Sequence, residues 1–310
     1  MTESKSLRIA YGEALAKLGE SNKKIVVLDA DLAHATMTSL FAAKFPDRFY
    51  NFGIAEANMV CASAGFAFEG FIPFVSTFAI FGAGRAYEQI RNAVAYAHAN
   101  VKFAFSHSGL SVGEDGGSHQ AVEDISLMRA IPGMTILAPC DPIEMEKAVK
   151  AAIEIEGPVY IRVARPVCPC LTGEDDPFIP GKANILKEGS RVSIFTMGLM
   201  VAEALEAAKL LEQEGISAGV INFHTIKPFD TETARKQAQK TGAVLTVEEH
   251  SIIGGLGSAA AEALAGTGEM RFDRLGIMDK FGKSGKPKDL FREYGLTAAN
   301  IAETCKKLLK

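Results

Sequence analysis

The chain has 310 residues, 48% of them hydrophobic, and a formal net charge of −4 without a dense basic run, so its composition does not indicate a nucleic-acid-binding protein. The most apolar region, residues 57–84, is interrupted by Glu69 and Pro73, which favours a buried core over a membrane span. The five cysteines lack CxxC spacing and no apolar signal core opens the chain, so we expect a cytoplasmic protein without disulfides or a metal site of its own.

The first half of the chain alternates between helix and strand patterns. Residues 6–19 carry apolar side chains at helical spacing, and the continuous apolar run KIVVL at 24–28 predicts a buried parallel strand. Further strands are predicted at 73–77, 101–106, 135–137 and 159–163, and further helices at 57–68, 82–98, 121–130 and 142–154.

The second half repeats this alternation after a segment rich in proline. Residues 166–190 have no periodicity and are predicted to be a linker. Strands are predicted at 192–196, 218–222 and 243–247, and helices at 200–214, 230–240, 258–265 and 297–309. The pattern predicts an α/β protein of two doubly wound α/β/α domains, residues 1–165 and 191–310, joined by the linker.

Glu56 is a lone acid at the start of an apolar stretch, residues 51–91, that holds six phenylalanines between positions 66 and 81. A carboxyl group that loses hydration there can hold or share a proton near neutral pH, as acid–base catalysis requires. The alternative is an acid placed at a helix N-terminus by the helix dipole. The residues alone leave both interpretations open.

Two glycine-rich segments are further candidates. In the polar loop 107–124, His107, Asp115 and His119 can converge on one polar ligand, although the loop lacks the spacing of a helical two-histidine metal site. An ordinary solvated loop is the alternative. The turn 254–258 is either a phosphate cradle at a helix N-terminus or a tight strand-to-helix turn.

Several of these segments resemble the transketolase family. They are GIAEANM at 53–59, STFAIF at 76–81, HSGLSVGEDGGSHQ at 107–120, PCD at 139–141 and TVEEH at 246–250. The resemblance covers nearly the whole chain but only the C-terminal part of a full-length transketolase. It implies a thiamine-diphosphate-binding pyrimidine domain followed by a transketolase C-terminal domain, as in the C-terminal subunit of a split transketolase.

The resemblance implies roles at the cofactor. Glu56 matches the glutamate that hydrogen-bonds the aminopyrimidine ring of thiamine diphosphate and so promotes deprotonation of the thiazolium C2. Phe78 and Phe81 match aromatic residues that pack on the pyrimidine, and Asp31 matches an acid at the cofactor edge. Gly84 stands where the family has a tyrosine, and Tyr87 is a candidate to replace it.

The resemblance also implies roles at the sugar substrate. Asp115 matches an aspartate that reads a sugar hydroxyl, and His119 matches a histidine near the reacting hydroxyls, so Glu56, Asp115 and His119 form the predicted catalytic set. His107, Arg8 and Arg165 match residues around the substrate phosphate, which two guanidinium groups suit well. Ala35 stands where the family commonly has a phosphate-contacting serine.

The Gly-Asp-Gly motif that holds the diphosphate through Mg²⁺ in this family does not occur in the sequence. The resemblance therefore implies an N-terminal partner subunit that carries the motif and the Mg²⁺ ligands, and a homodimer of this chain within an α2β2 heterotetramer. The implied activity moves a two-carbon ketol unit between ketose and aldose phosphates of the pentose phosphate type. The alternatives are the C-terminal part of a deoxyxylulose phosphate synthase, the β subunit of a 2-oxo acid dehydrogenase, and a non-catalytic α/β binding module.

Overall fold

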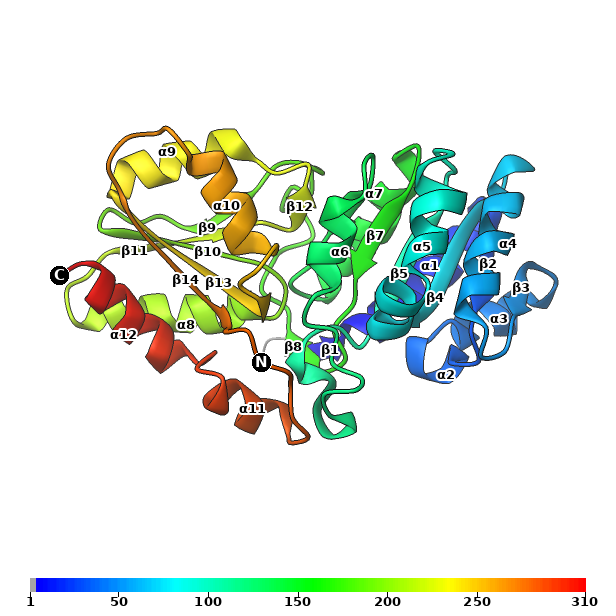
Figure 1. Ribbon diagram of the computed structural model, residues 1–310, viewed down its shortest axis with the longest axis horizontal. Helices are drawn as coiled ribbons and strands as arrows, with labels where there is room; N and C mark the ends of the chain where they lie inside the picture. Colours follow the sequence, from blue (N-terminus) through cyan, green and yellow to red (C-terminus); the bar gives the residue numbers. More distant parts are fainter. Residues whose placement is uncertain (1–3) are drawn as a thin grey trace.

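The computed structural model describes residues 4–310 and contains two α/β domains that lie side by side (Figure 1). The first sheet has seven strands, and all neighbours in it are parallel except β12 with β6. In spatial order they are β12 (Thr225–Lys227), β6 (Thr135–Leu137), β7 (Val159–Arg162), β5 (Lys102–Ser106), β4 (Ile72–Phe78), β2 (Ile25–Asp29) and β3 (Phe49–Asn51).

Helices cover both faces of the first sheet because β2, β4 and β5 are buried along their whole length and present apolar side chains to both sides. One face packs against α1 (Leu7–Ser21), α3 (Ser39–Lys44) and α7 (Pro142–Glu154). The other packs against α4 (Glu56–Phe68), α6 (Asp124–Ala130) and the segment 80–95.

The second sheet has five strands, parallel except for the antiparallel edge strand β9. They are β14 (Arg271–Ile277), β13 (Ala243–Ser251), β10 (Val192–Thr196), β11 (Ala218–Asn222) and β9 (Asn184–Lys187). Helices α8 (Met200–Gln213) and α12 (Ala298–Leu308) cover one face, and α9 (Thr231–Thr241) and α10 (Leu256–Leu264) cover the other. The two predicted doubly wound α/β domains are thus confirmed.

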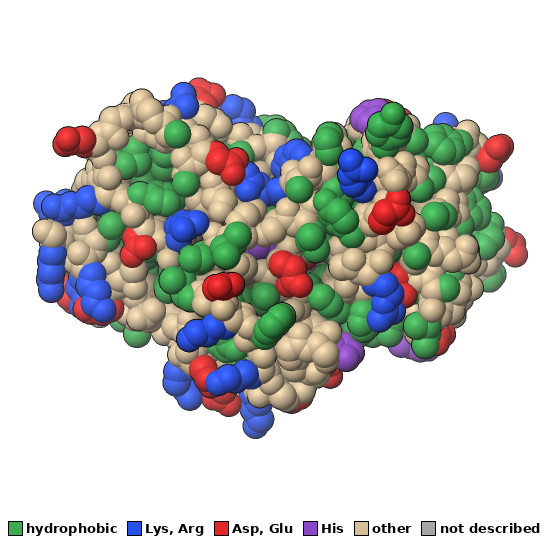
Figure 2. All heavy atoms as spheres, in the orientation of Figure 1, with side chains coloured by type: hydrophobic (Ala, Val, Ile, Leu, Met, Phe, Trp, Pro, Cys, Tyr) green, Lys and Arg blue, Asp and Glu red, His purple; other side chains and the backbone are tan. Residues whose placement is uncertain are grey.

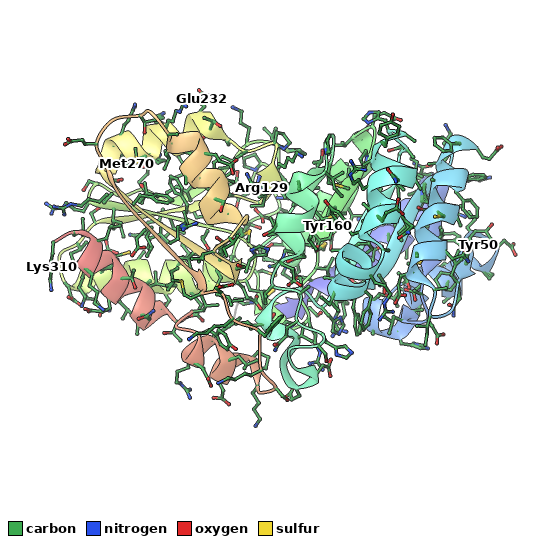
Figure 3. The ribbon with its side chains drawn as sticks, in the orientation of Figure 1. Tyr50, Arg129, Tyr160, Glu232, Met270 and Lys310 are labelled. Atoms are coloured by element: carbon green, nitrogen blue, oxygen red, sulfur yellow. The ribbon has the colours of Figure 1, made fainter. Side chains whose placement is uncertain are left out.

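The domains share a core and hydrogen bonds. One apolar cluster runs from Met128 of α6 to Leu256 and Ala260 of α10 without interruption. Arg129, labelled in Figure 3, reaches from α6 to pair with Glu262 of α10 at 2.7 Å. Strand β12 comes from the second half of the chain but extends the first sheet, so the two halves are interlocked.

Two expectations need correction. The helix predicted over 82–98 is divided into a π-helical segment Ile80–Arg85, α5 (Tyr87–Gln89) and a second π-helical segment Ile90–Ala95. The ring of Phe105 packs against Gly82 so closely that a Cβ there would lie 2.3 Å from it, and this close approach accompanies the irregular backbone. The predicted linker 166–190 also carries β8 (Val167–Pro169) and β9.

Shorter elements complete the fold. They are β1 (Ser4–Ser6), which pairs with β8, α2 (Ala33–Thr36), the 3₁₀ segments Pro46–Arg48 and Leu110–Asp115, and α11 (Pro287–Glu293). None of the helices in residues 4–310 has the length and apolar character needed to cross a bilayer.

Candidate active site

The predicted site residues follow the carboxyl ends of neighbouring parallel strands. Asp31 lies two residues after β2, Phe78 ends β4, His107 directly follows β5, and Arg165 lies three residues after β7. The order of the sheet reverses at β2, since β3 lies on one side of it and β4 and β5 on the other. Ligands of open α/β sheets bind at such a reversal, outside the carboxyl ends of the strands.

Four aromatic rings form a cluster at this edge. The Phe78 ring stacks on His107 with centroids 3.7 Å apart and on Phe81 at 5.8 Å. His119 approaches Phe81 edge-on at 5.4 Å and Phe78 at 6.4 Å. The structure therefore brings together four of the predicted residues, from β4, the segment that follows it, and both ends of the loop 107–120.

Glu56 opens helix α4 at one side of the ring cluster and is only 3% exposed. Arg85 Nη1 donates to both carboxylate oxygens of Glu56, at 3.0 Å each. The Arg85 guanidinium also lies 4.7 Å from the centre of the Phe81 ring. Arg85 thus links the buried acid to the rings. The sequence analysis missed Arg85, and its position four residues after Phe81 is the signal that could have pointed to it.

Two arginines lie at the other side of the cluster. Arg8 donates from Nη1 to the carbonyl oxygen of Ala35 at 2.7 Å and from Nε to that of Arg165 at 3.3 Å. Burial and the neighbouring Arg165 lower the pKa of Arg8. Arg165 donates to the carbonyl of Val112 and pairs with the exposed Glu114 at 3.5 Å. Within residues 4–310 no carboxylate pairs with Arg8, so an anion placed between the two guanidinium groups would relieve their repulsion.

His107 lies between the rings and the arginines and is 3% exposed. Burial, and then the charges of Arg8, Arg165 and His119, lower its pKa to about 3. Its Nδ1 is 2.9 Å from the hydroxyl of Ser106, a contact that sequence reasoning missed. At neutral pH His107 is therefore uncharged and offers a hydrogen-bonding group rather than a positive charge.

Two predicted acids lie outside this cluster. Asp115 is exposed at the end of the segment Leu110–Asp115, and among residues 4–310 its carboxylate makes no hydrogen bond or ion pair. Asp31 is exposed and binds Asn51, whose Nδ2 donates to Asp31 Oδ1 at 3.2 Å and whose Oδ1 accepts from the backbone of Gly53. Tyr87 packs against the apolar cluster that includes Met128 and Leu256. In the described part of the chain it makes no ring contact with Phe78 or Phe81.

The turn 254–258 is not a phosphate cradle. The carboxylate of Glu248 accepts hydrogen bonds from the backbone N–H groups of Leu256 at 2.7 Å and Gly257 at 2.8 Å. These are the first N–H groups of α10, the ones that a phosphate would need. The tight-turn interpretation is therefore correct.

A family model for the transketolase pyrimidine-binding domain matches residues 3–169, and one for the transketolase C-terminal domain matches residues 181–301. The chain belongs to the transketolase family. Proteins of this family depend on thiamine diphosphate. The predicted family is thus confirmed, while the roles of individual residues remain predictions.

Transketolase relatives of two lengths resemble the chain. It is 45% identical to a putative transketolase C-terminal section of Methanocaldococcus jannaschii, over 99% of this chain and 97% of that one. It is 44% identical to a 6-deoxy-6-sulfo-D-fructose transketolase subunit of a Clostridium species, over 95% and 92%. Against human transketolase the identity is 37%, and the chain covers 49% of that protein.

Solved transketolase structures give the same picture. A split-gene transketolase described as an inactive beta4 tetramer superposes with a TM-score of 0.90 at 48% identity and is covered to 98%. Transketolase from Campylobacter jejuni superposes with a TM-score of 0.84 at 25% identity, and the chain covers 47% of it. The fold therefore corresponds to the C-terminal part of the full-length family members.

The site has features that suit the pyrimidine end of thiamine diphosphate. Glu56 supplies a buried carboxylate, and the adjacent rings of Phe78 and Phe81 supply an aromatic surface. Residues 4–310 contain no group of three histidine, cysteine or acidic side chains arranged to hold a metal ion. The fit thus extends to the ring end of the cofactor only.

Proposed function

We propose that this chain is the C-terminal subunit of a split, thiamine-diphosphate-dependent transketolase that moves a two-carbon ketol unit between ketose and aldose phosphates. The observation that carries the proposal is the row of side chains from Glu56, through the Phe78, Phe81, His107 and His119 rings, to the pair of Arg8 and Arg165. A buried acid, an aromatic surface and a cationic end suit a cofactor ring and a phosphorylated sugar beside it.

At the cofactor end, Glu56 would hydrogen-bond the aminopyrimidine ring while Phe78 and Phe81 pack on it. Bound thiamine diphosphate would supply the carbon nucleophile and the electron sink for the ketol transfer. Because Glu56 is 3% exposed, bulk water does not compete for its carboxylate, which can exchange a proton with a ring nitrogen. Asp31 would contribute indirectly, since it holds Asn51 and thereby the turn that leads to Glu56.

At the substrate end, Arg8 and Arg165 would hold the phosphate, with neutral His107 as a further hydrogen-bonding group. His119, at the ring cluster, would lie near the reacting hydroxyls. Asp115 is exposed and unpaired among the described residues, and it can therefore turn to a sugar hydroxyl. A sulfonate is also a tetrahedral anion, so a sulfonated sugar is a second substrate class for the same arginines, as the name of the clostridial relative indicates for that protein.

The diphosphate and Mg²⁺ would be held by a separate N-terminal subunit, because the sequence has no Gly-Asp-Gly motif. Apolar side chains are exposed at one end of the first domain, namely Tyr50, Ile54, Phe68 and Phe71. Figure 2 also shows hydrophobic side chains over the right-hand part of the molecule, where α4 and α5 lie. Exposed apolar patches mark interfaces, which is consistent with a homodimer of this chain in an α2β2 complex.

A deoxyxylulose phosphate synthase activity is the alternative with support from the comparisons. The synthase of Geobacter sulfurreducens is 39% identical over 96% of this chain, but the chain covers 47% of that protein. The relatives covered almost entirely are transketolase sections or subunits.

Cys61, Cys140, Cys168 and Cys305 are free thiols, which is consistent with a reducing compartment such as the cytoplasm.

A substrate comparison distinguishes these functions. The complex of this chain with a partner that carries Gly-Asp-Gly is supplied with thiamine diphosphate and Mg²⁺, and then either with a ketose phosphate and an aldose phosphate or with pyruvate and glyceraldehyde phosphate. Products are identified by mass spectrometry. Ketol transfer without loss of carbon dioxide supports the proposal. Carbon dioxide release from pyruvate with formation of a deoxyketose phosphate would establish the synthase instead.

A further inference from the structure

Two neighbouring acids near the carboxyl end of β13 point to different parts of the molecule. Both are buried, Glu248 at 0% and Glu249 at 2% exposed. Successive side chains of a strand face opposite sides, so two adjacent acids serve two surfaces. Glu248 binds the start of α10 within its own domain. Glu249 faces the loop 107–120 of the first domain, which carries both site histidines.

The Glu249 carboxylate makes a close contact with this loop at two points. Its Oε1 accepts a hydrogen bond from the backbone N–H of Ser111. A Cβ at Gly109 would lie 2.5 Å from the same oxygen, and Gly109 has φ +76°, so only glycine leaves room for the carboxylate. Gly109 itself donates to the carbonyl of Ala121 at 2.8 Å, which closes the base of the loop.

Buried groups hold Glu249 in place from behind. Arg162 Nη2 donates to the Glu249 carbonyl at 2.9 Å, and Arg162 Nε donates to Asp124 at 2.8 Å. Tyr160 donates to the same Asp124 oxygen at 2.6 Å. A buried network of this kind, in which Asp124 accepts from both Arg162 and Tyr160, has little freedom to move. The backbone that presents the Glu249 carboxylate is therefore anchored to the first sheet.

The second domain contacts the same loop again farther along. Gln120 donates to the carbonyl of Lys283 at 2.9 Å, and Ser284 donates to the carbonyl of Glu114. Figure 1 shows the loop after β5 beside α11, which follows this segment. These contacts hold Glu114 and Gln120, whereas Glu249 accepts from Ser111, the residue next to Val112, whose carbonyl accepts from Arg165.

We infer that Glu249 is a positioning residue through which the C-terminal domain sets the phosphate end of the active site. Its carboxylate holds the turn from Gly109 to Ser111, which keeps His107 stacked on Phe78 and the Val112 carbonyl in reach of Arg165. The role in substrate binding rests on the proposed function, whereas the hold on the loop rests on the contacts alone. The second domain thereby acts on the phosphate end of the site through the loop that Glu249 holds.

Backbone hydrogen exchange of the full chain tests the hold on the loop. Glu249→Ala should accelerate exchange of the 109–113 amides by roughly tenfold to a hundredfold, because the buried Ser111 N–H loses its acceptor. The matched control, Glu248→Ala, should accelerate the amides of Leu256 and Gly257 and leave 109–113 unchanged. Glu249→Gln retains an acceptor oxygen and should restore most of the protection.

The same variants are then assayed in the complex with the partner subunit. Glu249→Ala should raise KM for phosphorylated acceptors about tenfold, as for one lost contact, with a much smaller effect on kcat and on unphosphorylated aldehydes. If Glu249→Ala does not fold, Glu249→Asp replaces it, because its side chain is one methylene shorter. Glu249→Asp should show smaller increases in 109–113 exchange and in KM for phosphorylated acceptors.

Unchanged exchange at 109–113 in folded Glu249→Ala would overturn the inference, as would equal acceleration in both segments for both variants. Faster loop exchange with equal kinetic losses for both acceptor types would overturn the link to the phosphate. If the wild-type complex shows no ketol transfer while Glu249→Ala still exchanges faster in the loop, the hold on the loop is supported and the proposed function is overturned.

Discussion

Arg85 and Glu56 form an ion pair with unequal burial: the arginine is 53% exposed, whereas the carboxylate is 3% exposed and accepts both of its hydrogen bonds from one nitrogen. The same guanidinium covers the Phe81 ring. Arg85 therefore occupies the two surfaces that the proposal assigns to the cofactor pyrimidine. Because the arginine is largely solvated, it can leave at modest cost.

Replacing Arg85 by methionine should therefore strengthen thiamine diphosphate binding. The substitution removes a competitor for Glu56, and one partly exposed ion pair contributes about 1 kcal/mol, so affinity should rise several-fold, up to about tenfold. The measurement is calorimetric titration of the complex with the partner. Arg91→Met, at a neighbouring arginine bound to Asn92, is the control and should bind like the wild type. Weaker binding by Arg85→Met would mean that the arginine belongs to the cofactor site.

Glu56→Gln should reduce turnover in the complex by roughly a hundredfold or more, the usual loss for a positioned acid–base group. Glutamine retains the shape and accepts from Arg85 but cannot exchange the proton. Turnover is measured at saturating thiamine diphosphate, and circular dichroism verifies the fold. Near-wild-type turnover in a folded, saturated variant would end the assignment of Glu56.

Replacing Arg8 or Arg165 by methionine should raise KM for phosphorylated acceptors by roughly tenfold to a hundredfold, since each change removes one charge-assisted contact. An unphosphorylated aldehyde brings no anion to the two neighbouring guanidinium groups, so its KM should change far less when one of them is removed. Arg48→Met is the control, because that arginine binds backbone carbonyls of Gly19, Asn22 and Ile25. Equal losses with both acceptor types would show that the site arginines are structural.

Most central strands were predictable because they are apolar along their whole length, as parallel strands covered on both faces must be. The strands at 135–137, 192–196 and 218–222 occur with the predicted bounds. Strand β12 could not be predicted, since three residues, Thr225–Lys227, carry no pattern and join the sheet of the other domain. The irregular segment 80–95 was missed because its composition is that of an ordinary helix.

The site was predictable where motifs carried it. The Phe78, Phe81, His107 and His119 rings lie together in one cluster, while the roles that the resemblance implies for them stay predictions. Arg85 and Glu249 were missed for a different reason, because their roles depend on distant partners, Glu56 and Ser111. Spacing along the chain reports neighbours within one helix or strand but not contacts between segments far apart in the sequence, and the exposure of Asp115 likewise depends on how the loop folds.

His250 should contribute less to the stability of the protein in mild acid than at neutral pH. Its Nε2 accepts from the Ser126 backbone at 3.4 Å and its Nδ1 lies 2.7 Å from the Ser251 carbonyl, an arrangement for neutral imidazole. Burial lowers its pKa to about 4, partly opposed by Asp124. Since the pKa is lower in the folded state, this stability is fully present above about pH 6.5 and is lost as the pH falls towards 4.

Urea unfolding between pH 4 and 7.5 measures this effect. The free energy of unfolding of His250→Asn, taken relative to that of the wild type, should rise as the pH falls from 6.5 to 4, by up to about 1.4 kcal/mol per pH unit. His34→Asn, on the short helix α2, should leave the wild-type slope unchanged. Parallel pH profiles for wild type and His250→Asn would show that this histidine is not the titrating group.

We expect this chain to hold one end of the cofactor and a partner subunit to hold the other. The most direct test is a ketol-transfer assay with thiamine diphosphate and Mg²⁺, first on the purified chain and then with increasing amounts of a partner that carries Gly-Asp-Gly. We expect only background turnover from the chain alone, and activity that rises with added partner until the two chains are equimolar. Robust ketol transfer by the purified chain without a partner would contradict the account.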